Sequence, residues 1–266
     1  MSHSPLINVI QKAVLKAAKP LVRDFGEVDK LQISKKGTSN FVSSADIRTE
    51  QILIEELSHA RKDFGFLTEE GDPLQSDAEF RFVIDPIDGT SNFIHAISYF
   101  CMSVAVEKRN KDGEYEPIAG VIYEPIQDEL FIAEKGQGAT LNGRRLRVSP
   151  RQKDTMLATT TPRSERANFD EVEAALRRVT GAGATVRCAG AAALDLAYVA
   201  AGRYDGLWYH KLFRWDMAAG MLMVTEAGGT VTPIEGAAST SETGSIIATN
   251  GLIHNELQEL LSSTTR

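Results

Sequence analysis

Three apolar runs follow one another between Tyr99 and Glu134, and they constrain the fold more than any other part of the sequence. The runs read YFCMSVAVE, IAGVIYEP and ELFIAE. Short segments that contain Asp-Gly and Pro-Ile-Gln-Asp separate them, and segments of this composition join neighbouring antiparallel strands. We therefore expect an antiparallel meander in the first half of the chain.

Helical and strand-like segments surround this meander. Apolar residues recur at helical spacing from Pro5 to Phe25, where Pro20 can bend the helix, and a second helix follows Ser43 or Ser44 as its N-cap. Further helices are expected at FDEVEAALRRVT, GAAALDLAYVAAG, WDMAAGMLMVTEAGG and residues 253–261, and further strands at LQIS, FGFLTEE, RFVIDPI, YDGLWYH, GTVTP and SIIATN. The segments do not alternate regularly as βαβα, so we expect a layered mixture of helices and sheets rather than a doubly wound fold.

Composition narrows the class of protein. With 266 residues, 42% of them hydrophobic, the chain is long enough for one large domain or two small ones. Its net charge of −7 argues against broad, nonspecific binding to nucleic acid. Cys101 and Cys188 show no metal-binding or disulfide spacing, and no apolar run has the length of a signal peptide or membrane span. We expect free thiols in a cytoplasmic protein that does not contact the membrane.

Two acids, Asp85 and Asp88, stand at the end of the strand-like run RFVIDPI. Like charges raise each other's pKa and cost stability, so such a pair indicates a positive partner. The turn between them can direct both carboxylates and the carbonyl of Ile87 at one point, and hard oxygen ligands suit Mg²⁺ or Mn²⁺. The alternative is a common Asp-Pro turn in which an aspartate caps the following turn.

The next residues can supply the other side of a phosphate site. Gly89 lets the backbone turn closely, and a helical turn that begins at Thr90 would direct free N–H groups at an anion. Metal on one side and amides on the other would hold a phosphate group.

Two separated motifs now suggest a family. VIDPIDGTSNF, together with WDMAAG at residues 215–220, resembles the two signatures of the inositol monophosphatase family, the Mg²⁺-dependent, lithium-sensitive phosphatases. KKGTSNFVSSAD, GFLTEEG, AGVIYEPIQDELFIAEKGQGATLNG, GAAALDLAYVAAGRYDG and EAGG are similar to that family in the same order, so the resemblance covers nearly the whole chain. Bacterial members of the extragenic-suppressor type look most similar.

This resemblance implies a fold. It is an α+β, layered αβαβα sandwich of the sugar-phosphatase type, with an antiparallel-rich first sheet and a second mixed sheet. Residues 1–266 would form a single phosphatase unit, in which the halves 1–150 and 151–266 each carry one metal motif. Many relatives are dimers, so we expect a homodimer by resemblance alone.

The resemblance also implies metal ligands. Glu69 and Asp85 would bind one Mg²⁺ with the carbonyl of Ile87. Asp85, Asp88 and Asp216 would bind a second, and Glu69 would contribute to a third, weaker site. Trp215, beside Asp216, suggests that this acid lies in the first turn of a helix, where the helix dipole favours it.

Catalytic roles follow in the same way. Backbone N–H groups of Gly89 and Thr90 would bind the phosphate, and Thr90, paired with Asp46, would orient the attacking water, with Glu69 also in the catalytic set. A bound metal lowers the pKa of water from about 15.7 toward neutrality. We expect a metal-dependent phosphomonoesterase whose substrate is a small phosphorylated alcohol, first of all myo-inositol monophosphate. No histidine is required: His95 is expected to be structural, and His3, His59 and His254 to lie on the surface.

The substrate side departs from the family pattern. Gly190, Ala191, Ala192 and Tyr209 are the candidate substrate-binding residues. Members active on inositol phosphates commonly carry a hydroxyl residue where this chain has Ala191, and often an acid where it has Tyr209. Each lost hydrogen bond to a buried hydroxyl costs about 1 to 3 kcal/mol. Inositol preference is therefore open to question while the metal ligands are intact.

Other functions stay open on the sequence alone. Tyr209 with His210, Lys211 and Arg214 could present a donor-rich rim to another substrate, such as fructose 1,6-bisphosphate, histidinol phosphate or adenosine 3′,5′-bisphosphate. A regulatory role in transcription or RNA-processing complexes is a second class, which the charge balance does not support. A metal-binding module without turnover is a third. The phosphatase hypothesis predicts that Asp88→Asn and Asp216→Asn abolish phosphate release with little change in melting temperature in EDTA.

Overall fold

The computed structural model describes residues 4–27, 33–36, 40–161, 169–234 and 243–262 of the 266-residue chain. The helices are α1 (Pro5–Phe25), α2 (Ser44–Ala60), α3 (Thr90–Ile94), α4 (Phe169–Gly181), α5 (Ala192–Ala200), α6 (Arg214–Glu226) and α7 (His254–Ser262). The strands are β1 (Ile33–Lys36), β2 (Asn40–Ser43), β3 (Gly65–Thr68), β4 (Phe80–Asp88), β5 (Cys101–Arg109), β6 (Tyr115–Glu124), β7 (Glu129–Glu134), β8 (Gly138–Leu141), β9 (Arg144–Arg145), β10 (Met156–Ala158), β11 (Thr185–Arg187), β12 (Gly206–Phe213), β13 (Thr230–Pro233) and β14 (Thr243–Thr249).

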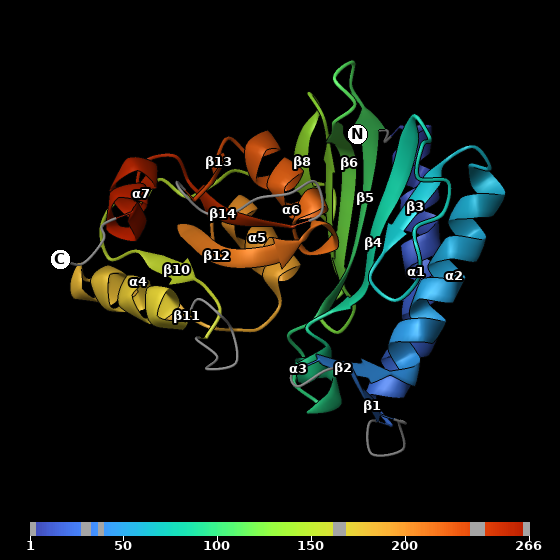
Figure 1. The fold of residues 1–266 in the computed structure, drawn as a ribbon, viewed down its shortest axis with the longest axis horizontal. Coiled ribbons are helices and arrows are strands. Elements are labelled where there is room, and N and C mark those ends of the chain that lie inside the picture. The colour runs from blue at the N-terminus through green and yellow to red at the C-terminus, as the bar shows by residue number, and fades with distance from the viewer. Residues whose placement is uncertain (1–3, 28–32, 37–39, 162–168, 235–242, 263–266) are drawn as a thin grey trace.

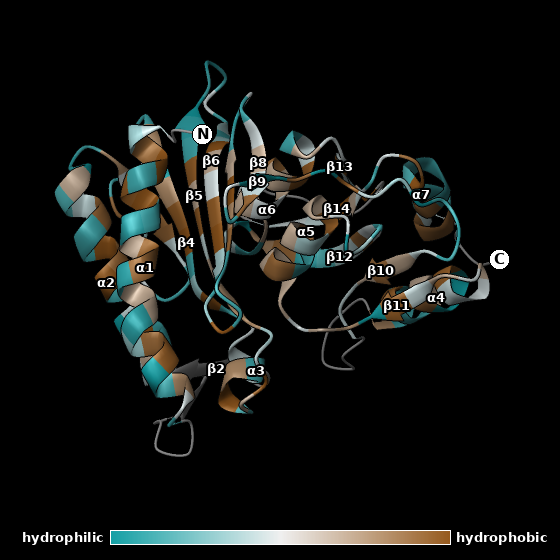
Figure 2. Cartoon of the chain, turned by 180° about the vertical axis from the view of Figure 1, so that it is seen from behind, coloured by the Kyte–Doolittle hydropathy of each residue, from teal (hydrophilic) through white to brown (hydrophobic). Residues whose placement is uncertain are grey.

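The first sheet has seven described strands in the order β3-β4-β5-β6-β7-β8-β9. Within the described residues β3 and β4 run parallel, and every other neighbouring pair is antiparallel. The expected meander of β5, β6 and β7 is therefore confirmed. Figure 2 shows β4 and β5 as apolar over much of their length, because both faces of this sheet are covered by helices.

Helices α1 and α2 cover one face of this sheet (Figure 1). Ser4 caps α1 by accepting the backbone N–H of Ile7, and Pro5 occupies the first turn, where its missing N–H costs nothing. The helix continues through Pro20 to Phe25. Its buried residues recur at the spacing expected from the sequence and pack on β5 and β6.

Helices α5 and α6 lie between the first sheet and the second, five-stranded sheet, whose order is β11-β10-β12-β14-β13. That sheet is mixed, since β10 is parallel to β11 and β12 while β14 is antiparallel to β12 and β13. Helices α4 and α7 pack on its outer face. The expected layered αβαβα sandwich is confirmed.

Close packing of α5 on α6 depends on one glycine. A Cβ added at Gly220 would lie 2.4 Å from the Cβ of Leu196, so α6 can approach α5 this closely because residue 220 has no side chain. Both helices are buried between the two sheets, which explains why GAAALDLAYVAAG and WDMAAGMLMV consist largely of small and apolar residues.

The differences from the sequence prediction concern short elements. Strands β8 to β11 have two to four residues each and were not expected. The expected strand LQIS corresponds to β1 only from Ile33, since residues 28–32 lie outside the described ranges. None of the helices in those ranges combines the length and apolar character that a bilayer crossing requires. Cys101 and Cys188 are both free, as expected.

Candidate active site

Strand β4 carries Asp85 and Asp88 on the same side because its pairing with β5 is interrupted between them. Asp85 pairs with Ser103 and Asp88 with Cys101, so one extra residue is accommodated on β4. Residues three apart in a regular strand point to opposite faces. The irregularity instead turns Ile87 toward α1 and α2 and leaves both carboxylates on the face that meets α5 and α6.

Three other acids approach Asp85 from separate elements. Glu69 follows β3 and donates its N–H to the carbonyl of Ile84 at 3.2 Å, so it lies beside β4 at the same edge of the sheet. Asp46 and Asp216 lie in the first turns of α2 and α6. Burial first, and then the charges of Glu69, Asp88, Asp216 and Asp46, raise the pKa of Asp85 well above its ordinary value. The structure thus brings Asp46, Glu69 and Asp216 near enough to Asp85 for their charges to act on it, and their role as a ligand set stays a prediction.

The pKa of Glu69 is raised by burial and by some of the same acids. Burial raises it to about 8, helped by the charges of Asp216, Asp46 and Glu70, and a hydrogen bond with Asp85 acts in the opposite direction. Such a cluster destabilises the charged protein unless cations neutralise it.

Asp88 has different surroundings, because its carboxylate lies at the start of α5. It accepts the backbone N–H groups of Ala192, Ala193 and Leu194 at 3.1, 2.6 and 3.3 Å. Burial raises the pKa of Asp88 to about 7, and these three hydrogen bonds oppose the rise. Asp88 therefore caps α5 in addition to the ligand role that the sequence suggests, and the two roles share about four acceptor positions on one carboxylate.

The turn after β4 matches the sequence prediction. Helix α3 begins at Thr90, and Gly89 precedes it with φ of 95°, which favours glycine. The Thr90 hydroxyl lies 3.5 Å from Oδ1 of Asp46 and 2.9 Å from the carbonyl of Ile87. Its single proton can be donated to only one of them at a time, and the carbonyl of Ile87 is the nearer acceptor.

Residues 189–191 approach this turn from the second half of the chain. A Cβ added at Gly89 would lie 3.2 Å from that of Ala191, so the two candidate substrate-binding segments are in contact. Asn92 holds them together by donating to the carbonyls of Tyr99 and Ala189 at 2.7 and 2.8 Å. Asn92 lies within the signature VIDPIDGTSNF, but no local pattern in the sequence indicates this role.

Tyr209 is not on a rim, contrary to the sequence expectation. It is 4% exposed, and its hydroxyl donates to Oδ2 of Asp195 at 2.5 Å. Tyr99 donates to the other oxygen of Asp195 at the same distance. Sequence reasoning missed Asp195 and Tyr99, because a single acid inside an apolar helix and a tyrosine 96 residues away form no local pattern.

The rest of the proposed rim is also largely wrong. Arg214 pairs with the buried carboxylate of Glu107, and His210 is buried, which leaves Lys211 exposed. His254 was expected on the surface but is buried, where its ring lies 3.0 Å from the hydroxyls of Thr232 and Thr249. His59 and His95 are exposed, and His3 lies outside the described residues.

Comparison with known proteins identifies the family to which this arrangement belongs. Residues 2–266 match the inositol monophosphatase family. The chain belongs to the inositol monophosphatase family. As a member it is a phosphatase, and the family is generally metal-dependent.

Individual relatives are similar over almost their whole length. An inositol-1-monophosphatase of Rhizobium meliloti is 47% identical over 264 residues, which are 98% of this chain and 97% of the relative. A crystal structure of the extragenic suppressor protein suhB of Bartonella henselae covers 98% of this chain and 100% of its own, with 46% identity and a TM-score of 0.89. The Nus factor SuhB of Pseudomonas aeruginosa is 38% identical over 253 residues, 92% of each chain.

The chemistry of these residues fits the metal dependence that is general in the inositol monophosphatase family. Oδ1 of Asp85 is buried and has no hydrogen-bond partner among the described residues, and the surrounding acids supply hard oxygen donors of the kind that bind Mg²⁺ or Mn²⁺. Within the described ranges, no three acidic, histidine or cysteine side chains are arranged so that they could hold a metal ion as they stand.

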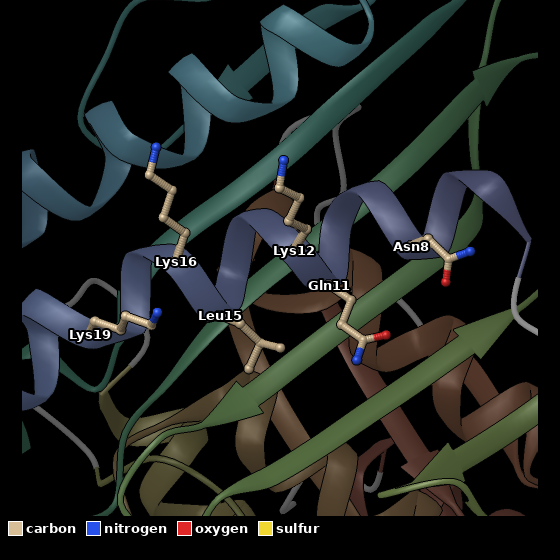
Figure 3. Close-up of a pocket in the computed structure, with 6 residues that line it drawn as sticks. All are labelled: Asn8, Gln11, Lys12, Leu15, Lys16 and Lys19. Atoms are coloured by element: carbon tan, nitrogen blue, oxygen red, sulfur yellow. The ribbon is translucent and has the colours of Figure 1, made fainter.

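A separate hollow of about 560 Å³ lies on the outer face of α1 (Figure 3). Asn8, Gln11, Lys12, Leu15, Lys16 and Lys19 line it. Lys12 and Lys16 point toward α2, where Lys16 donates to Glu56 at 2.5 Å. None of the lining residues is acidic, so this hollow is not the metal site of the phosphatase.

Proposed function

We propose that the chain is a Mg²⁺-dependent phosphomonoesterase that hydrolyses a small phosphorylated alcohol, with myo-inositol monophosphate as the first candidate substrate. The supporting observation is the convergence of Glu69, Asp85 and Asp216, from three separate elements, around a buried carboxylate oxygen without a partner. Stability alone would not select such a cluster. Relatives named inositol-1-monophosphatase at 45% and 47% identity support the substrate.

The proposed ligands are Glu69, Asp85, Asp88, Asp216 and the carbonyl of Ile87. When bound there, Mg²⁺ would supply an activated water and neutralise charge on the phosphoryl group. The protein would hold this arrangement through the irregularity in β4 and the first turn of α6.

The remaining steps would depend on the turn that follows β4. The Thr90 hydroxyl can donate its proton to Asp46 or to the Ile87 carbonyl, and its oxygen would orient the attacking water by accepting a hydrogen bond from it. Backbone N–H groups at Gly89 and Thr90 would hold the phosphate. Gly190, Ala191 and Ala192 would form the neighbouring wall, because Ala191 contacts Gly89.

The wall formed by Gly190, Ala191 and Ala192 would affect which phosphorylated alcohol the site prefers. Tyr209 has its hydroxyl committed to Asp195, and Ala191 offers no hydroxyl, so this wall presents few acceptors for a polyol. We propose weaker discrimination among alcohols than an acid at residue 209 would provide, by about 1 to 3 kcal/mol for each missing hydrogen bond.

A phosphate-release assay tests the function. Myo-inositol 1-phosphate, fructose 1,6-bisphosphate, histidinol phosphate and adenosine 3′,5′-bisphosphate are each supplied with Mg²⁺, with Mn²⁺ and with EDTA. We expect release that depends on the cation, and the largest kcat/KM for inositol 1-phosphate. A larger kcat/KM for one of the other compounds would identify that compound as the better substrate. Release unaffected by EDTA would contradict the proposed metal dependence.

A binding role in transcription or RNA processing is the second candidate, supported by relatives named Nus factor SuhB at 36% to 38% identity. Asp85→Asn separates the two roles in cells that lack the protein. Growth restored by this variant, once its folding is verified, would assign the phenotype to binding. Failure of the folded variant would assign it to hydrolysis.

A further inference from the structure

Glu107 is a fully buried carboxylate on β5 that lies between two arginines. Arg81 of β4 approaches one of its oxygens, with Nε at 2.9 Å and the terminal nitrogen at 2.8 Å. Arg214 approaches the other oxygen, with the corresponding distances 2.6 and 2.5 Å. Glu107 itself is 0% exposed, so these contacts are shielded from water and geometrically specific.

Arg214 is the first residue of α6, and Asp216 lies two positions further in the same turn. Two more contacts fix this turn. The carboxylate of Asp216 accepts the N–H of Phe213 at 2.8 Å, and the carbonyl of Trp215 accepts the hydroxyl of Ser103 at 3.4 Å.

These contacts attach the start of α6 mainly to β5, and Arg214 also donates to the carbonyl of Tyr115 on β6 at 3.3 Å. Ser103 and Glu107 both lie on β5, and Ser103 is the pairing partner of Asp85. The position of α6 along β5 therefore determines how far Asp216 lies from Asp85. An arginine that contacts one oxygen of Glu107 through two nitrogens sets that position more sharply than the single contact at Ser103.

We propose that Arg214 and Glu107 are positioning residues for the metal site: their ion pair fixes the first turn of α6 and so holds Asp216 against Asp85 and Glu69. The inference rests on the proposed function, because it presupposes a cation at these acids. It goes beyond that function by assigning a role to two residues outside the proposed metal ligands and substrate-binding residues.

Arg81 provides a matched control. It neutralises the same carboxylate from the opposite side, but it belongs to β4 and stacks on the ring of Tyr115 at 3.9 Å rather than contacting α6. Loss of either arginine leaves Glu107 paired with the other. Arg81→Met and Arg214→Met should therefore lower stability alike, while only Arg214→Met should change the metal site.

The experiment measures binding of Mn²⁺ alone by calorimetry and by electron paramagnetic resonance of free Mn²⁺, for wild type, Arg214→Met, Arg214→Lys and Arg81→Met. Residues that orient metal ligands typically contribute about 10- to 100-fold in metal affinity. We expect Arg214→Met to weaken Mn²⁺ binding about tenfold or more, Arg214→Lys to recover part of the loss, and Arg81→Met to bind within about twofold of wild type. The Mg²⁺ concentration for half-maximal phosphate release should rise in parallel, with kcat at saturating Mg²⁺ largely retained.

A double-mutant cycle tests the route of the effect. If Arg214 acts through Asp216, Arg214→Met should weaken Mn²⁺ binding no further in a chain that already carries Asp216→Asn. Additive losses would overturn the inference, as would unchanged Mn²⁺ affinity in Arg214→Met or an equal loss in Arg81→Met. If the wild-type protein binds no Mn²⁺, the proposed function and this inference are overturned together. If the wild type is active and binds Mn²⁺ while Arg214→Met binds Mn²⁺ equally well, the inference alone is overturned.

Discussion

Asp85 and Asp88 have the same side chain and lie three residues apart, yet their surroundings differ. Oδ1 of Asp85 has no partner among the described residues, and other acids surround it. Both oxygens of Asp88 accept N–H groups from α5. The same substitution at the two positions should therefore affect stability in different ways.

Asp85→Asn should abolish phosphate release without loss of stability. Burial and the neighbouring acids disfavour the ionised form of Asp85, and an asparagine cannot ionise, so the free energy of unfolding in EDTA should stay the same or rise by about 1 kcal/mol. Urea unfolding in EDTA and phosphate release with Mg²⁺ measure the two effects. Retained release would exclude Asp85 from the ligand set.

Asp88→Asn should abolish release and also destabilise the protein in EDTA. An asparagine keeps one acceptor and places its NH₂ group among the N–H groups of α5, so the free energy of unfolding should fall by about 1 to 3 kcal/mol. This replaces the expectation from sequence of a nearly unchanged melting temperature. Asp85→Asn, the same chemical change, is the control, and equal stability of the two variants would contradict the capping role.

At the scale of elements, α5 connects the two sheets through Asp195. Tyr209 reaches it from β12 and Tyr99 from the segment before β5. Burial raises the pKa of Asp195 to about 7, and the hydrogen bonds from Tyr209 and Tyr99 oppose the rise. Because this pKa lies above that of an unfolded aspartate, the contribution of Asp195 to stability is present at low pH and is lost as the pH rises toward 7.

Tyr209→Phe should therefore destabilise the protein more at pH 8 than at pH 5. A hydrogen bond to a neutral carboxyl contributes about 1 kcal/mol, and one to a carboxylate about 1.5 to 3 kcal/mol. Urea unfolding at the two pH values in EDTA measures the difference. Tyr123→Phe is the matched control, because its hydroxyl donates at 2.7 Å to the exposed Asp128, and its effect should not depend on pH in this range. Equal losses at both pH values for Tyr209→Phe would contradict the assignment.

Periodicity predicted the long elements well, and it failed where structure depends on distant partners. The spacing of apolar residues in α1 and the turns of the meander are local, so the sequence shows them. Strand β10, with three residues, exists because β11 and β12 pair with it on both sides. The acids assigned to the site were predicted by resemblance, Asp85, Asp88 and Asp216 from the two signatures and Glu69 and Asp46 from GFLTEEG and KKGTSNFVSSAD. The pairing of Arg214 with Glu107 was not, because 107 residues separate them and an arginine before an acid has the pattern of a solvated loop.

At the scale of the whole molecule, the acidic cluster makes stability depend on pH and on cations together. Burial raises the pKa of Glu69 to about 8 and that of Asp88 to about 7, so the folded chain binds more protons than the unfolded chain between about pH 4.5 and 8. In EDTA the free energy of unfolding should accordingly decrease as the pH rises through this range.

Mg²⁺ should reverse most of that decrease. A ligand at one hundred times its dissociation constant stabilises the folded state by about 2.7 kcal/mol. Unfolding by urea at pH 5.5 and 8, with Mg²⁺ or EDTA, measures the effect, which should be larger at pH 8 and should disappear in Asp85→Asn. A Mg²⁺ effect of the same size in that variant would locate the cation elsewhere.

The hydrogen bonds between Asp88 and the start of α5 span 104 to 106 positions of the chain. At a synthesis rate of roughly 5 to 20 residues per second, a ribosome needs at least about five seconds to deliver α5 after it has delivered Asp88. During that interval the carboxylates of the nascent first half lack the helix that orients one of them. The catalytic centre is thus completed late in translation, when the second half emerges.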